Sequence, residues 1–194
     1  MKKAKYGLLA LTAAIVVAVL ALPASADTSG WLHGEKPLEG HVTMATTGGE
    51  VIEFGGSVLV CETAASITTE GGSSAQITSY SVSKASCAGV AGELEGCTVT
   101  AATSTGLPWS LAVNTADLTA GEVRVDYSLN EACPIDKIET SFPELTLTPE
   151  EPSAINLFRF SQEGTAKVDG KATTIGYFGS LNLPEEEFGT YGIG

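Results

Sequence analysis

The feature that most constrains this chain is a period-two alternation of apolar and polar residues, in short runs closed by turn residues. In one run Val123, Val125, Tyr127 and Leu129 alternate with Glu122, Arg124, Asp126 and Ser128. Because successive side chains of a strand point to opposite faces, this pattern predicts strands with one buried and one solvated face. No run shows a convincing helical period. We therefore expect an all-β protein, a single antiparallel β-sandwich or barrel with disulfides.

Turn residues between the runs predict three hairpins. They join Leu107–Thr115 to Glu122–Leu129, Ser57–Thr69 to Ala75–Ser86, and Ile155–Val168 to Ala172–Leu183. The last turn is Asp169-Gly170, a pair that suits a tight turn with positive φ at both positions. Between the second pair of strands and the third, the segment from Cys133 to Pro152 contains four prolines, which lack a backbone N–H. We expect an edge strand or a long connection there.

The N-terminus has the form of a removable secretory signal. Lys2, Lys3 and Lys5 precede an apolar run from Leu8 to Leu20, and the small residues of 24–26 precede Asp27. We predict a signal peptide over 1–26, an N-terminal arm over 27–50 and one β-rich domain over 51–194. The product is expected to be secreted into an oxidising, extracellular environment, with no membrane span.

The charge balance excludes some partners. Removing the signal's three lysines from the ten basic residues leaves seven against 23 acidic ones, a net charge of −16. Such a surface repels nucleic acid and anionic membranes, so we expect no nucleic-acid partner.

Four cysteines follow the signal and allow three disulfide pairings. Cys87 and Cys97 flank a glycine-rich connection, so our preferred bridge joins them across a hairpin mouth. Cys61 and Cys133 then pair by elimination. No two cysteines have the short gap that is typical of zinc ribbons, which favours disulfides over a metal site.

The search for catalytic chemistry finds no complete set of residues. His33 and His41 are the only histidines, and with Glu35 and Glu39 they could bind a divalent metal or supply a base. Their spacing matches no catalytic metal motif, and no Gly-x-Ser-x-Gly elbow occurs. We therefore predict no catalytic residues, no cofactor and no metal. A small secreted hydrolase that depends on either histidine is kept as an alternative.

The two tryptophans receive different interpretations. Trp109 lies on the apolar side of an alternating run, which is typical of a core residue; the alternative is the lining of a small apolar pocket. Trp31, near the mature N-terminus, is expected to be exposed and to anchor a partner chain.

Several short motifs are shared with a known group of proteins. They are Cys61, Ala75-Gln76-Ile77-Thr78-Ser79, Cys87-Ala88-Gly89-Val90, Gly106-Leu107-Pro108-Trp109 and Cys133. Over about residues 57–133 the chain resembles secreted bacterial proteins of the alkane-oxidation activator (Pra) type. The resemblance implies a non-catalytic extracellular or cell-surface protein, associated with growth on hydrophobic substrates or with surface adhesion. It supplies no catalytic residues.

Two non-enzymatic functions follow. In the first, a secreted β-protein binds a hydrophobic small molecule, a lipid or a cell-surface polymer, with Trp109 and Trp31 as candidate apolar contacts. In the second, the chain is a subunit of an extracellular assembly or adhesin. Its arm, from Asp27 to Gly49, would then self-associate by adding as a strand to a neighbour's open sheet edge.

Overall fold

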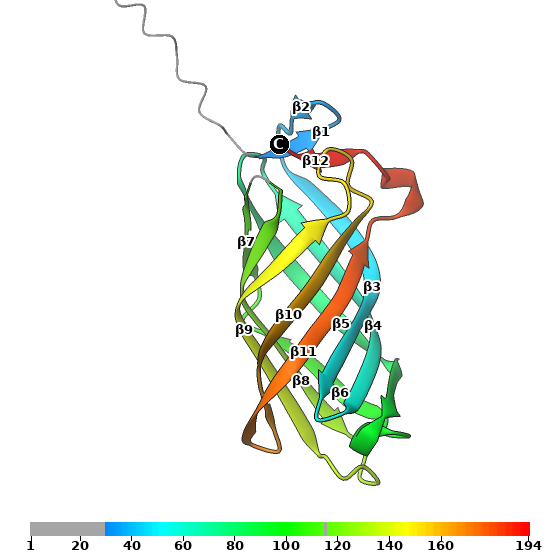
Figure 1. Cartoon of the computed structure of the whole chain (residues 1–194). Helices are drawn as coiled ribbons and strands as arrows, with labels where there is room; N and C mark the ends of the chain where they lie inside the picture. The colour runs from blue at the N-terminus through cyan, green and yellow to red at the C-terminus, as the bar shows by residue number, and fades with distance from the viewer. Residues whose placement is uncertain (1–29, 115) are drawn as a thin grey trace, which may run out of the picture.

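The structure is a computed structural model that describes residues 30–114 and 116–194. These form a closed antiparallel β-barrel with a small sheet at one end (Figure 1). The all-β prediction is confirmed, and the architecture is a barrel. The predicted signal peptide (1–26), the first residues of the predicted arm and Thr115 lie outside the described residues.

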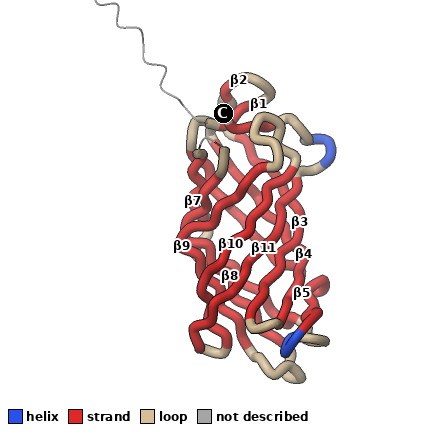
Figure 2. Tube along the Cα trace, in the orientation of Figure 1, coloured by secondary structure: helices blue, strands red, loops and turns tan. Residues whose placement is uncertain are grey.

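Strands make up most of the described chain (Figure 2). The barrel wall contains β3 (Val42–Phe54), β4 (Ser57–Thr69), β5 (Ser74–Ala91), β6 (Val99–Thr105), β7 (Trp109–Val113), β8 (Leu118–Leu129), β9 (Lys137–Pro149), β10 (Leu157–Val168) and β11 (Lys171–Asn182). The small sheet contains β1 (Trp31–His33), β2 (Lys36–Pro37) and β12 (Tyr191–Ile193). Two short 3₁₀ turns, η1 (Gly92–Leu94) and η2 (Glu185–Glu187), complete the description.

From β3 to β5 and from β7 to β11 each strand pairs with the next in sequence, β5 pairs with β7, and β11 returns to pair with β3. β6 and β7 share one place in the wall, because both pair with the same side of β8. β7 pairs with the first residues of β8, and β6 pairs with the second half of β8. Since β9 pairs with the other side of β8, the ring has eight places.

Two of the three predicted hairpins are confirmed. β4 pairs with β5, and β10 pairs with β11 around Asp169 and Gly170, whose φ angles are 48° and 76°. The hairpin at Trp109 has a different register from the predicted one. Its turn is closed by the Asn114 N–H, which donates to the Asp117 carbonyl oxygen (2.8 Å), so β8 starts at Leu118 and its second half pairs with β6.

The prediction that prolines exclude a central strand from 133–152 is wrong, because β9 lies between β8 and β10. Pro143 lies where the β9–β10 ladder is interrupted, opposite residues 160–164. The side chain of Gln162 replaces the missing ladder there. Its Nε2 donates to the Glu144 carbonyl oxygen (2.7 Å), and its Oε1 accepts from the Thr146 N–H (3.3 Å). A residue without an N–H is tolerated at such an interruption.

The prediction of an arm over 27–50 is also wrong for its described part. β3 begins at Val42 and runs inside the wall between β4 and β11. Trp31, expected to be exposed, is 1% exposed and packs edge-on against Phe158 with ring centroids 6.5 Å apart. The small sheet thus covers one end of the barrel with this indole.

All four cysteines form disulfides, as expected, but the preferred pairing is wrong. The bonds are Cys61–Cys87 and Cys97–Cys133. β5 carries extra residues relative to β4 just before Cys87, and this bulge brings Cys87 beside Cys61, with Cα atoms 4.1 Å apart. The second bond joins the segment after η1 to the β8–β9 connection. Two disulfides indicate an oxidising environment.

Inward-facing side chains fill the barrel. Trp109 belongs to this core, as its place in an alternating run predicts. Leu94 and Ile135 are buried at the end opposite Trp31. Packing therefore extends from one end of the barrel to the other.

Candidate functional site

A carboxylate lies in the interior of the barrel. Glu50 of β3 is completely buried, and three tyrosine hydroxyls donate hydrogen bonds to its carboxylate, each with an O···O distance of 2.6 Å. Tyr127 donates to Oε1, whereas Tyr80 and Tyr177 donate to Oε2. The four side chains come from β3, β5, β8 and β11. The carboxylate therefore connects four places of the wall; we call these four residues the Glu50 cluster.

Strand alternation explains why Glu50 points inward. Met44, Ile52 and Phe54 occupy the same face of β3, and all three are buried. Glu50 stands in this series, at a position where an apolar residue is expected. The three tyrosines occupy inward positions of their own strands, where their rings contribute apolar surface and their hydroxyls reach the carboxylate.

Burial sets the electrostatics of this cluster. Loss of hydration raises the pKa of Glu50 above its ordinary value of 4.5, and the three tyrosine hydrogen bonds offset part of this rise. Burial, together with the nearby Glu50 carboxylate, raises the pKa values of Tyr80, Tyr127 and Tyr177 well above 10. Glu50 is the one charged residue in the buried core of residues 30–114 and 116–194. Its partners are neutral donors, and no buried cation accompanies it in that part of the chain.

Aromatic rings surround the cluster. Phe142 stacks on Tyr177 with centroids 4.8 Å apart, and Phe160 lies 4.9 Å from the same ring. Trp109 lies 5.3 Å from Tyr80. The carboxylate is therefore held in a largely apolar environment.

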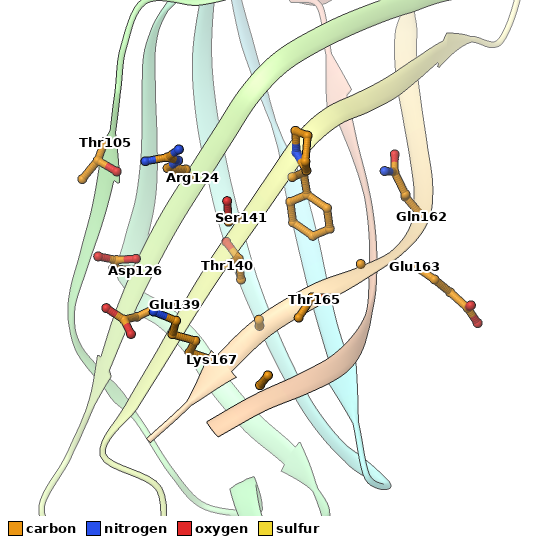
Figure 3. A pocket seen from close by; sticks show the side chains of 15 residues that line it. Thr105, Arg124, Asp126, Glu139, Thr140, Ser141, Gln162, Glu163, Thr165 and Lys167 are labelled. Carbon is orange, nitrogen blue, oxygen red and sulfur yellow. The ribbon is translucent and has the colours of Figure 1, made fainter. Parts of the chain in front are cut away.

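The outer wall carries a groove of about 690 Å³ across β8, β9 and β10 (Figure 3). Charged side chains line one part of it: Arg124, Asp126, Glu139 and Lys167. A row of hydroxyl groups crosses it beside Arg124, because Thr105, Arg124, Ser141 and Thr165 are successive cross-strand neighbours. The groove combines charges of both signs with neutral hydrogen-bonding groups.

Two acids of the groove, Asp126 and Glu139, pair with a lysine that lies beside it. Lys137 Nζ lies 2.7 Å from Glu139 Oε1 and 3.9 Å from Asp126 Oδ2. The hydrogen bond and charge of Lys137 lower the pKa of Glu139, with a smaller contribution from Lys167. The same pairing raises the pKa of Lys137.

The histidines lie apart from both features. His33 is exposed on β1, where its ring centroid lies 6.0 Å from that of Tyr191. His41 is exposed beside a different hollow, next to Thr68 and Gln76. In the described part of the chain, no three His, Cys, Asp or Glu side chains gather to hold a metal ion.

Reasoning from sequence missed the Glu50 cluster. Glu50 lies at the end of the segment predicted to be an arm. With 23 acidic residues in the chain, the presence of one more carboxylate does not by itself indicate a site. A signal was nevertheless present. Extending the alternation of Ile52 and Phe54 back along the chain places Glu50 at a core position, and a charged residue in an inward series indicates a buried polar site.

Comparisons of this chain with protein-family models, curated proteins and solved structures find no match. Within residues 30–114 and 116–194, no helix has the length and apolar character needed to cross a membrane.

Proposed function

We propose that this chain is a secreted, non-enzymatic binding protein that contacts its partner through the outer wall of the barrel. The signal-like residues 1–26 and the two disulfides support secretion. The observation that carries the proposal is the packed interior, filled from Trp31 at one end to Leu94 at the other. A partner of any size therefore meets the outer wall.

The groove on β8–β10 supports a polar, uncharged polymer as that partner. Its row of hydroxyls and its charged side chains of both signs can exchange hydrogen bonds with the hydroxyl groups of a sugar chain. The net charge of −16 predicted for the mature chain repels acidic polymers. A neutral cell-surface polysaccharide fits both properties.

Hydrocarbon, which the Pra-type resemblance suggests, has less support from the wall. The large apolar side chains that are exposed among the described residues are Val60, Val90 and Phe188, and none of them lines the groove. An assembly through the predicted arm also has little support, because Trp31 and β3 pack into the chain's own fold.

Retention on insoluble neutral polysaccharides tests the proposal, with dispersed hexadecane as the competing phase. The purified chain should be retained on at least one of cellulose, chitin or starch granules. Thr165→Trp fills the groove at an exposed position and should lower retention about tenfold or more, the effect of losing a central contact. Ser79→Trp is the matched control on β5, outside the groove, and should bind as the unchanged chain does.

Two results would overturn the proposal. One is retention on hexadecane alone, which would assign the contact to apolar side chains. The other is no retention on any phase, or equal loss in both tryptophan variants.

A further inference from the structure

Three oxygen atoms of the Glu50 cluster form a triangle of mutual contacts. The hydroxyl oxygens of Tyr80 and Tyr177 each lie 2.6 Å from Glu50 Oε2, and they lie 3.1 Å from each other. Each side of the triangle is a hydrogen bond, so three hydrogens are required. The two tyrosines supply one each. An ionised Glu50 supplies none and leaves one side of the triangle without a hydrogen.

A neutral Glu50 completes the triangle. With a hydrogen on Oε2, the carboxyl donates to Tyr177, Tyr177 donates to Tyr80, and Tyr80 donates to Oε2. Every oxygen of the triangle then gives one hydrogen and receives one. Tyr127 stands outside the triangle, because its hydroxyl bonds to Oε1. Burial favours the same neutral form, since it raises the pKa of Glu50.

No other buried group in the described part of the chain changes its charge at moderate pH. Besides Glu50, the buried titratable side chains there are Tyr80 on β5, Tyr127 on β8, Tyr177 on β11 and cysteines, which are all disulfide-bonded. The pKa values of the three tyrosines lie well above 10. Between pH 4 and pH 9, Glu50 is therefore the buried group that can lose a proton.

Tyr80 lies at a junction of the barrel wall that lacks a backbone ladder within the described residues. β5 pairs with the start of β7, and it meets the chain again at the isolated bridge between Ala88 and Thr98. Between these two points no ladder joins β5 to β6, which pairs with β8 alone. We call this junction, residues 78–87 beside residues 99–108, the seam.

Two side-chain hydrogen bonds hold the wall around Tyr80. Ser104 Oγ donates to the Tyr80 carbonyl oxygen across the seam over 2.7 Å. Trp109, whose ring centroid lies 5.3 Å from that of Tyr80, donates from Nε1 to the Thr105 carbonyl oxygen over 2.9 Å. The inward-facing Ala102 and Ser104 are only half-buried, so solvent reaches the wall beside Tyr80.

The two tyrosines of the triangle are held to different degrees. Tyr177 lies on β11, which pairs with β10 on one side and with β3 on the other, and its ring packs against Phe142 and Phe160. Tyr80 pairs with Ala65 of β4 on one side, and its other side faces the seam. A repulsion between the two hydroxyl oxygens is therefore expected to displace Tyr80.

We propose that the third hydrogen of the triangle is the carboxyl proton of Glu50, and that its release to water opens the wall at the seam. The resulting carboxylate takes the hydrogens of both Tyr80 and Tyr177. The two hydroxyl oxygens then face each other with lone pairs alone, and Tyr80 moves away together with its bond to Ser104. Because the pKa of Glu50 is raised in the closed barrel, closure is complete below about pH 4.5 and is lost as pH rises through the folded pKa.

Infrared spectroscopy of the intact, disulfide-bonded chain tests the position of the proton. A protonated carboxyl has a carbonyl stretching band that an ionised carboxylate lacks. During a titration from pH 4 to pH 9, one such band should persist after the exposed carboxyls have lost theirs, and it should be missing from Glu50→Gln. Absence of this late band from the unchanged chain would overturn the proposal.

Exchange of the two indole N–H groups tests the opening. Trp109 Nε1 is bonded at the seam, whereas Trp31 Nε1 is buried where the small sheet covers the end of the barrel. Both groups exchange by the same chemistry, so the ratio of their rates removes the effect of pH on that chemistry. The ratio of the Trp109 rate to the Trp31 rate should rise with pH, by up to about tenfold per unit while Glu50 loses its proton.

Two tyrosine variants provide a matched pair. Tyr177→Phe removes a corner of the triangle, whereas Tyr127→Phe removes the hydroxyl that bonds to Oε1 outside it. Each variant deletes one hydrogen bond to Glu50. The exchange ratio should no longer respond to pH in Tyr177→Phe, and it should still rise in Tyr127→Phe. Glu50→Gln, which has no proton to lose in this range, should also hold the ratio constant.

Equal responses of the two tyrosine variants, or an exchange ratio that does not change with pH in the unchanged chain, would overturn the opening at the seam. If Glu50→Gln does not fold, the tyrosine pair still decides the question. Failure here would leave retention on polysaccharide unchanged, since that experiment depends on the outer groove alone.

Discussion

Two carboxylates of the same barrel, one buried inside the wall and one on its outer surface, show how differently one chemical group behaves in the two places. Glu50 has three neutral hydroxyl donors and a raised pKa. Glu139 has one cationic donor, Lys137, and a lowered pKa. The buried group has more hydrogen bonds, yet its charged form is the less favoured of the two.

Hydration accounts for the difference. Glu139 keeps contact with water and adds a cation, whereas Glu50 exchanges its water for tyrosine hydroxyls that offset only part of the desolvation. Number of hydrogen bonds is therefore a poor guide to charge state in this fold. Position relative to the wall decides it.

The two carboxylates should differ most in how much stability is lost when each side chain is removed. Glu50→Ala leaves three buried hydroxyls without their acceptor, and we expect the free energy of unfolding to fall by about 3–5 kcal/mol. Glu139→Ala removes a solvent-exposed ion pair and should leave the urea midpoint unchanged within error. Urea denaturation followed by tryptophan fluorescence measures both. Similar midpoints for the two variants would contradict the comparison.

The second largest difference between the buried and the exposed carboxylate should lie in the pH dependence of the free energy of unfolding. A raised pKa means that the contribution of Glu50 to stability is fully present below about pH 4.5 and is lost as pH rises through its folded pKa. Relative to Glu50→Gln, the unchanged chain should lose up to about 1.4 kcal/mol per pH unit across that window. The facing tyrosines remain protonated there, because their pKa values lie well above 10.

Urea titrations of both chains between pH 4 and pH 9 measure this difference. Parallel stability curves would show that Glu50 does not change protonation on unfolding.

Gln162 tests whether a side chain on the outer surface can stabilise the fold when it forms hydrogen bonds with backbone groups. Gln162→Ala removes two hydrogen bonds to β9, to Glu144 and Thr146, and should cost about 1–2 kcal/mol. Hydrogen exchange at the Thr146 amide should also accelerate. Gln76→Ala on β5 is the control, since its amide makes no side-chain hydrogen bond in the described part of the chain. Equal effects would refute the proposed role of Gln162 in the ladder.

The smallest effect is expected at the exposed ion pair. Lys137→Met removes the donor that lowers the pKa of Glu139, so this pKa should rise toward its ordinary value. NMR titration of the Glu139 carboxyl carbon measures the change, which should diminish at high salt. Lys171→Met, outside the ion pairs of the described residues, should not alter it.

Local signals account for the parts of the fold that sequence predicted. Asp169-Gly170 identifies its hairpin because both φ angles are positive, which few other residue pairs permit. Alternation likewise predicts the burial of Trp109. These features depend on residues close together in the chain.

Features that depend on the ring were not predictable. The Cys61–Cys87 bond needs a bulge in β5, and no residue pattern marks that bulge. β9 tolerates Pro143 because Gln162 replaces the ladder, a compensation supplied by another strand. The Glu50 cluster needs four strands to converge, so it exists only after the barrel closes.

The pairing of β3 with β11 has a consequence for how the chain folds. Thr47 of β3 lies opposite Asn182 of β11. The edge of β3 that does not face β4 therefore stays unpaired until β11, the last strand of the wall, has formed. Pairings between strands so far apart in the sequence make folding slow, and until they form the unpaired strand edge can associate with other chains. A chain that leaves the ribosome N-terminus first therefore cannot close the barrel until its C-terminal strands have been made.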